Sequence, residues 1–152
     1  MASAPISIVL VAPQIAGNFG AVLRTAANFR LAFHAVQPFG FPLTEKALRR
    51  ARMDYEADLT VYADWDAYAT STARRILLTT QGSSALPDFE FQPGDQLVFG
   101  NEGSGAPEAV HASVDARVRI PVAGRSLNLS ASVALTAYEA LRQLGQLPNA
   151  RP

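Results

Sequence analysis

Short apolar segments alternate along the chain with segments of helical periodicity, and this alternation restricts the fold more than any other feature. The first apolar segment, ISIVLV at residues 6–11, is a continuous run typical of strands that are buried on both faces. Pro13 ends it, and residues 18–29 then carry apolar side chains at helical spacing. Regular alternation of strands and helices predicts an α/β fold, a mainly parallel sheet with helices on both faces. Further strands are predicted at 33–38, 59–62, 75–80, 95–100 and 116–121, and further helices at 45–52, 64–71, from 107 and at 130–144.

Polar residues at the expected helix starts predict where these helices begin. We expect Asn18, Thr44, Asp64 and Ser130 to act as N-caps, because their side-chain oxygens can accept from the free N–H groups of a first turn. The last helix should end at Gly145.

The length of 152 residues suits one domain, expected to span residues 1–152 with a loose tail over 146–152. Apolar residues make up 49% of the chain and charged residues 17%, which is typical of a folded protein. Cysteine is absent, and His34 and His111 lie far apart, so we expect neither disulfides nor a metal site. No apolar run is long enough to span a membrane, and no basic residue precedes the first one, so the predicted location is cytoplasmic.

The net charge is zero, but the charges are segregated along the chain. Residues 24–52 carry six cations against Glu45, and residues 54–115 carry eleven acids against two arginines. Such segregation can create a basic face on a neutral protein, and arginine suits phosphate recognition. From charge alone, ordinary solvated helix faces remain the simpler interpretation.

Three polar clusters each follow a predicted strand, and ligands of open α/β sheets bind beyond the carboxyl ends of strands. The first cluster is GNFGAVLR at residues 17–24, and a capped helix start explains most of it. Arg24 lies between Leu23 and Ala27, so we expect it to be partly buried at the boundary of helix and sheet. A partly buried arginine needs an anionic or hydrogen-bonding partner.

The second cluster is GNEGSGAP at residues 100–107, which matches neither the dinucleotide-binding nor the P-loop pattern. Its glycines permit close approach of the backbone to a flat ligand. Glu102 argues against a phosphate and favours a cationic or hydroxyl-bearing partner. A mobile turn between strand and helix is an equally good interpretation.

The third cluster is SLNLS at residues 126–130, where leucines alternate with polar residues. In an extended loop the leucines would lie on one side and could contact an aromatic ring, while Asn128 and backbone groups supply hydrogen bonds. The alternative is a plain capping loop with its leucines in the core.

Taken together and in this order, the clusters resemble the motifs of the SpoU branch of the SPOUT superfamily of RNA 2′-O-methyltransferases. N-x-G-x-x-x-R is matched by Asn18, Gly20 and Arg24, and G-x-E-x-x-G by Gly100, Glu102 and Gly105. The third motif, I-P…S-L-N-x-S, is matched from Ile120 to Ser130, and the resemblance covers nearly the whole chain. Segments 39–56 and 137–145 resemble the minimal members that methylate the wobble nucleotide of leucine tRNAs, although Ala21 and Ala106 depart from their pattern.

The resemblance implies a C-terminal trefoil knot, a homodimer, and S-adenosylmethionine as the methyl donor, with S-adenosylhomocysteine as the product. Val133, Ala137, Leu141 and Leu144 on the last helix would belong to the dimer interface or simply to the core. The implied catalytic residues are Arg24, Asn18, Ser126 and Asn128; the cofactor-binding residues are Leu78, Thr79, Gly100, Glu102, Gly105, Ile120, Ser126, Leu127 and Leu129; and the RNA-binding residues are Lys46, Arg49, Arg50, Arg125 and Tyr138.

The implied reaction is methylation of the ribose 2′-hydroxyl of a wobble cytidine or uridine in tRNA. One alternative is the same chemistry on ribosomal RNA or at another tRNA position. Another is a catalytically idle RNA-binding module, and a third is a nucleotide-binding domain of flavodoxin type, which should not bind S-adenosylhomocysteine.

Overall fold

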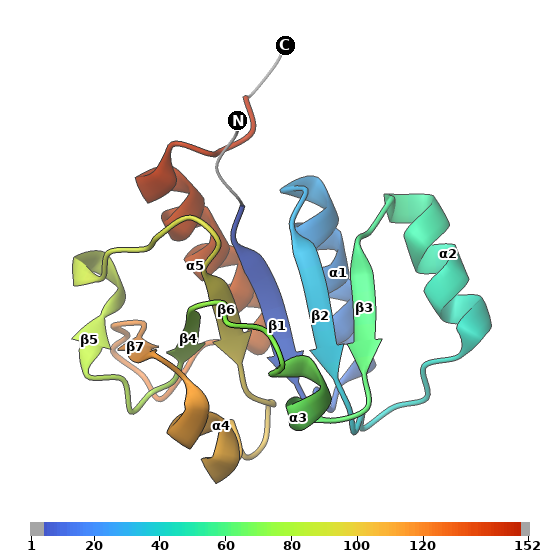
Figure 1. The fold of residues 1–152 in the computed structure, drawn as a ribbon, viewed down its shortest axis with the longest axis horizontal. Helices are drawn as coiled ribbons and strands as arrows, with labels where there is room; N and C mark the ends of the chain where they lie inside the picture. Colours follow the sequence, from blue (N-terminus) through green and yellow to red (C-terminus); the bar gives the residue numbers. More distant parts are fainter. Residues whose placement is uncertain (1–4, 150–152) are drawn as a thin grey trace.

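The computed structural model describes residues 5–149 and contains, in this part of the chain, one sheet of seven parallel strands (Figure 1). The strand order is β3-β2-β1-β6-β4-β7-β5, and every neighbouring pair is parallel. The predicted α/β fold with a mainly parallel sheet is therefore confirmed. The strands are β1 Ser7–Val11, β2 Ala32–Val36, β3 Leu59–Tyr62, β4 Arg75–Leu78, β5 Ser84–Ala85, β6 Gln96–Phe99 and β7 Ala116–Arg119.

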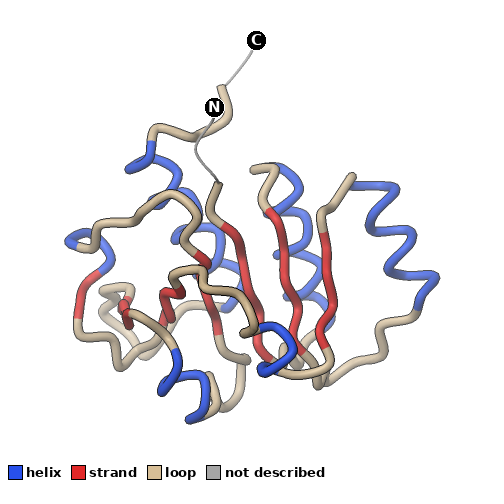
Figure 2. The backbone as a smooth tube through the Cα atoms, in the orientation of Figure 1, coloured by secondary structure: helices blue, strands red, loops and turns tan. Residues whose placement is uncertain are grey.

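Helices cover both faces of this sheet (Figures 1 and 2). Helices α1, α2 and α5 pack on one face, and the short helices α3 and α4 pack on the other. Figure 1 shows α2 at the edge of the molecule beside β3. The helices are α1 Ala16–Asn28, α2 Glu45–Tyr55, α3 Trp65–Tyr68, α4 Glu108–Ser113 and α5 Leu129–Leu144, and a 3₁₀ turn spans Leu86–Asp88.

The continuous apolar run of β1 is buried on both faces of the sheet, as its sequence predicts. Ile8 and Leu10 pack with α1 and α5, while Val9 and Val11 pack with α3 and α4. Because successive side chains of a strand point to opposite faces, a strand between two helical layers needs apolar residues at every position.

The order of the strands brings loops that are distant in sequence to one edge of the sheet. The chain runs outward from β1 to β3, then crosses to β4, and β6 later inserts between β1 and β4. The carboxyl ends of β1, β4, β6 and β7 therefore lie side by side, which is where ligands bind in open α/β sheets.

Two of the four predicted helix caps are confirmed and two are wrong. Thr44 and Asp64 accept hydrogen bonds from the backbone of α2 and α3. Helix α1, however, begins at Ala16, so Asn18 lies inside it and does not cap it. Asn128 caps α5 by accepting from Ala131 N, and Ser130 lies within the helix.

Helix α5 buries the side that one alternative assigned to a dimer interface. Val133, Ala137 and Leu141 are at most 2% exposed and lie in the main core, so the alternative that assigned them to the core is correct. In the predicted tail, Gln146 N–H donates to the Leu141 carbonyl and Leu147 packs against the core, while 150–152 lie outside the described residues. Among residues 5–149, no helix is both long enough and apolar enough to cross a bilayer.

Candidate functional site

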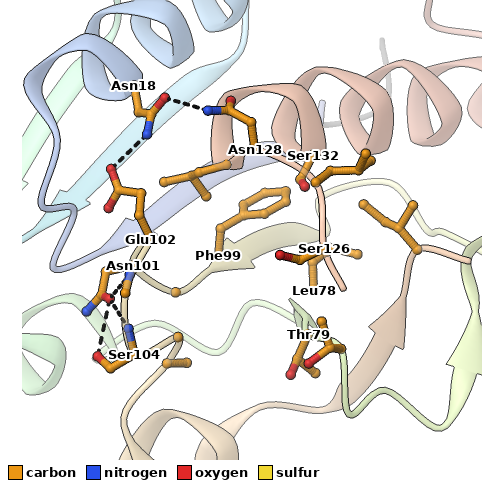
Figure 3. A pocket seen from close by; sticks show the side chains of 18 of the residues that line it. Asn18, Leu78, Thr79, Phe99, Asn101, Glu102, Ser104, Ser126, Asn128 and Ser132 are labelled. Atoms are coloured by element: carbon orange, nitrogen blue, oxygen red, sulfur yellow. Dashed lines mark hydrogen bonds between the residues drawn. The ribbon is translucent and has the colours of Figure 1, made fainter. Parts of the chain in front are cut away.

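A cavity of about 630 Å³ opens at the carboxyl ends of β4, β6 and β7 (Figure 3). This volume lies within the roughly 300–1,000 Å³ typical of small-molecule sites. Its wall includes every residue predicted to bind the cofactor and three of the four predicted catalytic residues. The lining residues are Ile15, Asn18, Leu78, Thr79, Thr80, Phe99, Gly100, Asn101, Glu102, Gly103, Ser104, Gly105, Ala106, Ile120, Val122, Ser126, Leu127, Asn128, Leu129 and Ser132.

The cavity has the mixed lining that a ligand with an aromatic ring and polar edges requires. Leu78, Phe99, Ile120 and Leu129 supply apolar walls, and backbone and hydroxyl groups supply hydrogen-bonding partners. The segment 126–130 is an extended loop only in its first part, because Leu129 is already the first residue of α5. Leucines and polar residues of this segment line the same cavity.

Gly100 allows the loop after β6 to fold back against its own strand end. A Cβ at this position would overlap the backbone of Gly105 and Ala106. The loop closes by reciprocal backbone hydrogen bonds between Asn101 and Gly105, at 3.1 and 3.2 Å, and Gly105 has a positive φ of 73°. Gly100 and Gly105 of the second cluster thus meet specific backbone requirements.

Asn101 stabilises this loop through its side chain, although it is not among the predicted site residues. Its side-chain oxygen accepts from Gly103 N at 2.9 Å and from Ser104 N at 2.7 Å (Figure 3). Asparagine side chains commonly bond the backbone two residues further on, so an asparagine in a glycine-rich loop is a sequence signal for this role.

Glu102 points from this loop toward the start of α1 (Figure 3). Its carboxylate accepts from the backbone N–H groups of Gln14 and Ile15 and from Asn18 Nδ2, at 2.8, 3.0 and 3.0 Å. Burial acts to raise the pKa of Glu102, but the hydrogen bonds from Gln14, Asn18 and Ile15 together hold that pKa below its ordinary value. The group is therefore an anion at neutral pH.

Asn18 connects Glu102 to the start of α5. Its side-chain oxygen accepts from Asn128 Nδ2 at 3.1 Å (Figure 3). Asn128 Oδ1 in turn accepts from Ala131 N at 3.2 Å and from the Ser130 hydroxyl. The three motifs singled out in the sequence thus meet through side chains in one place.

Arg24 lies outside this cavity in the single chain. It is exposed on α1, and its side chain forms no hydrogen bond or ion pair with residues 5–149, so the expectation that it would be partly buried with a partner is wrong. It lies one helical turn before Asn28, and the two residues share a face of α1.

The other predicted RNA-binding residues also lie on the surface. Lys46, Arg49 and Arg50 are exposed along α2, and Arg125 is exposed in the loop before α5. Tyr138 is 52% exposed and lies with Leu135 in an apolar groove between α1 and α5. The groove is lined by Thr25, Asn28, Phe29, Ala131, Ala134, Leu135 and Tyr138.

The parallel sheet and the cavity at its carboxyl edge define an α/β protein with a ligand site built from the loops after β4, β6 and β7 and the starts of α1 and α5. The chain belongs to the SpoU rRNA Methylase family, which it matches over residues 5–138. The resemblance seen in the sequence is thereby confirmed.

Several proteins are similar to this chain in sequence as well as in fold. A protein from Burkholderia ambifaria named tRNA (cytidine(34)-2′-O)-methyltransferase is 43% identical, over 91% of this chain and 96% of that protein. A protein of the same name from Escherichia coli K12 is 38% identical, over 92% and 94% of the two chains. A solved structure described as "Structural insights into the 2-OH methylation of C/U34 on tRNA" matches with a TM-score of 0.84 at 38% identity, over 93% and 97%.

Proposed function

We propose that the protein is a methyltransferase that transfers the methyl group of S-adenosylmethionine to the ribose 2′-hydroxyl of nucleotide 34 in tRNA, a cytidine or uridine of leucine tRNAs. The observation that carries this proposal is the meeting of Asn18, Glu102 and Asn128, one from each motif, at the rim of a cavity of about 630 Å³. Relatives named for this reaction at 43% and 38% identity over nearly the full chain support the choice of substrate.

The cavity fits the cofactor in size and in the chemistry of its lining. Leu78, Ile120, Leu127 and Leu129 would contact the adenine, and Thr79 and the backbone from Gly100 to Gly105 would hold its polar parts. Gly100 lets the backbone of Gly105 and Ala106 return closely against the end of β6, which shapes this wall of the cavity. When bound, S-adenosylmethionine supplies a methyl group activated by a sulfonium.

The chain's own residues would align the ribose and stabilise charge on its oxygen. Asn18, Ser126 and Asn128 offer amide and hydroxyl groups that can orient the ribose hydroxyls, which contributes through proximity. Arg24 would bind the phosphate beside the reacting nucleotide and favour negative charge on the 2′-oxygen. A guanidinium stays protonated at neutral pH, so its role is electrostatic and it does not act as a base.

The proposed enzyme is a cytoplasmic, single-domain homodimer with a knotted C-terminal segment, joined through the apolar groove between α1 and α5. Leu135 and Tyr138 expose 44% and 52% of their surface beside this groove, and Arg24 lies on the adjoining face of α1. Arg24 is too far along α1 to line its own chain's cavity, so in the dimer it would complete the site of the partner. Lys46, Arg49, Arg50 and Arg125 would contact the tRNA backbone.

Arg24→Ala tests the catalytic assignment. We expect this variant to lose methylation of tRNA while S-adenosylhomocysteine binds with nearly unchanged affinity in calorimetry, because Arg24 does not line the cavity. Arg24→Lys, which keeps the charge but not the planar fork, should retain partial activity. Normal turnover by Arg24→Ala would contradict the assignment.

Mixing two inactive variants tests whether Arg24 acts across the dimer. An equal mixture of the Arg24→Ala protein and the Asn128→Ala protein should recover up to about a quarter of the normal activity. Half of the dimers are then mixed, and each mixed dimer holds one complete site out of two. A mixture that stays inactive although sedimentation shows subunit exchange would contradict the shared site.

Mass mapping of ribose-methylated nucleosides identifies the substrate. A strain that lacks the gene should lose 2′-O-methylation at position 34 of leucine tRNAs, and the purified protein should restore it. Loss of a ribosomal or other tRNA methyl group instead would support the alternative RNA substrates. An unchanged map together with binding of S-adenosylhomocysteine would favour an idle RNA-binding module.

A further inference from the structure

The Glu102 carboxylate ends a series of side-chain hydrogen bonds that crosses the rim of the cavity. Glu102 accepts from Asn18 Nδ2 at 3.0 Å, and Asn18 Oδ1 accepts from Asn128 Nδ2 at 3.1 Å (Figure 3). Asn128 Oδ1 accepts from Ala131 N at 3.2 Å. The first and second of these contacts join residues that are 84 and 110 positions apart. They therefore link parts of the chain that local structure does not connect.

The backbone leaves these loops unconnected. Within residues 5–149, no backbone hydrogen bond joins the segments 12–18, 100–106 and 126–130 to one another. Strands β1 and β6 are paired only as far as Leu10 and Phe99, just before the first two segments begin. The relative position of the loops at the rim thus depends on the side-chain contacts between them.

The two ends of this series give it one direction. A carboxylate only accepts hydrogen bonds, and the free N–H groups at the start of α5 only donate. An asparagine amide presents a donor on one side and an acceptor on the other. Only one orientation of Asn18 and one of Asn128 satisfies every contact, and turning either amide would place two donors or two acceptors face to face.

We infer that Glu102 is a positioning residue whose negative charge sets the orientation of both amides, so that Asn18 and Asn128 present fixed donors and acceptors to the ribose of the substrate. Both of its oxygens already accept protein N–H groups, from Gln14 N and from Ile15 N and Asn18 Nδ2 respectively. Three protein N–H groups thus already occupy most of its acceptor positions, and the carboxylate acts through Asn18. Hydrogen bonds to an ionised group are also stronger than neutral ones, which makes Glu102 the anchor of the series.

The role toward the ribose depends on the proposed function, whereas the orientation of the amides does not. Glu102→Gln tests both, because it keeps the shape of the side chain and removes the charge and one acceptor. In NMR spectra, the hydrogen-bonded side-chain amide protons of Asn18 and Asn128 should both shift and exchange faster in this variant. In kinetics, kcat should fall roughly ten- to a hundredfold, while the Kd for S-adenosylhomocysteine should change less than about threefold.

A second variant locates the effect in the series. Asn128→Asp keeps the oxygen that caps α5 but cannot donate to Asn18, so it should also lower kcat. Combined with Glu102→Gln, it should cost little more than the larger single effect, because both changes interrupt the same series. Glu108→Gln, at an exposed carboxylate that forms no hydrogen bond with the described residues, should leave both amide signals and kcat unchanged.

Each outcome separates the possible roles of Glu102. Unchanged amide signals of Asn18 and Asn128 in Glu102→Gln would overturn the inference. A large rise in the Kd for S-adenosylhomocysteine with a normal kcat would instead make Glu102 a cofactor ligand and would equally overturn it. If the native protein methylated no tRNA at all, the proposed function would fail, but the NMR result would still decide the orientation of the amides.

Discussion

Gly100 shows how a single missing side chain shapes the cavity. Its Cα faces the returning backbone of Gly105 and Ala106, so any Cβ would push the loop away from the end of β6. Gly103 belongs to the same loop, yet a Cβ there would meet nothing closer than Asn101 Oδ1 at 3.7 Å. The two glycines therefore differ in what they contribute, although the sequence motif contains both.

Gly100→Ala should abolish binding of S-adenosylhomocysteine and lower the stability by about 1–3 kcal/mol, because the loop must shift to accept the methyl group. Gly103→Ala should leave both properties close to normal. Calorimetry and thermal unfolding of the two variants check this prediction. If the two variants bound S-adenosylhomocysteine equally well and were equally stable, the close backbone contact at Gly100 would not be required.

His34 gives the stability a dependence on pH. Its Nδ1 lies 3.0 Å from the Tyr62 hydroxyl, and its ring packs against Tyr62 and Tyr68. Burial lowers the pKa of His34 below the ordinary value of 6.5, and the charge of Asp58 acts in the opposite direction without reversing the shift. The folded protein thus keeps the imidazole of His34 neutral. The contribution of His34 to stability is therefore fully present at pH values above the pKa of this histidine in the unfolded chain.

We expect the free energy of unfolding to decrease as the pH falls below 6.5, since the unfolded chain then binds a proton at His34 that the folded chain resists. His34→Phe should remove this component of the pH dependence even if it changes the stability itself. His111→Gln serves as the control for loss of a histidine. Denaturant titrations from pH 5 to pH 8 give the measurement, and an unchanged slope in His34→Phe would contradict the explanation.

At the scale of elements, α2 is the helix most dependent on its own local interactions. It places only Leu48 in the core and stands at the edge of the molecule (Figure 1). Its start is held by the Thr44 hydroxyl, which accepts from Ala47 N at 3.0 Å. We therefore expect this helix to open independently of the core.

Thr44→Ala should therefore destabilise α2 by about 1 kcal/mol and raise hydrogen exchange across residues 45–55, with little effect on the sheet. The affinity for tRNA should fall as well, because Lys46, Arg49 and Arg50 lose their fixed arrangement. Thr44→Ser keeps the capping oxygen and should behave almost as the native protein. Exchange that rises equally in β1 and α2 would show that the helix does not open on its own.

At the scale of the whole molecule, the net charge is zero, yet several cationic side chains have no partner among the described residues. A set of cationic side chains forms no hydrogen bond or ion pair with residues that the structure describes: Arg24, Arg30, Lys46, Arg49, Arg50 and Arg125. The cations in the second half of the chain more often have partners. Arg142, for example, pairs with Glu139 at 2.8 Å, and Arg119 donates to the Gly82 carbonyl. Cations without internal partners remain available to an anionic ligand.

Replacing Lys46, Arg49 and Arg50 together by alanine should weaken tRNA binding and reduce the slope of log K against log salt by about one for each phosphate that the helix no longer binds. Affinity for S-adenosylhomocysteine should not change, because α2 does not line the cavity. Arg142→Ala, which removes a paired cation, should leave the slope as it is. If the triple variant kept the salt dependence of tRNA binding that the native protein shows, α2 would be excluded from the RNA-binding surface.

The sequence alone determined the main strands and helices and the positions of the three polar clusters. The parallel α/β sheet follows from apolar runs that alternate with helical patterns, and the Thr44 and Asp64 caps follow from contacts within three residues. The three motif clusters were located correctly, because each follows a strand and such ends meet at one edge of a parallel sheet. These features depend on interactions that are local or that repeat with a short period.

Only the tertiary structure decided what the polar side chains of the clusters do. Asn18 was predicted to cap a helix but binds Glu102 and Asn128, and Asn128 took the capping role predicted for Ser130. Arg24 was expected to be partly buried but is exposed. The partners of Asn18 lie 84 and 110 residues away, so no local pattern could identify them. The orientation of a polar side chain depends on which donors and acceptors the fold brings within about 3 Å, and that is settled only when the loops converge.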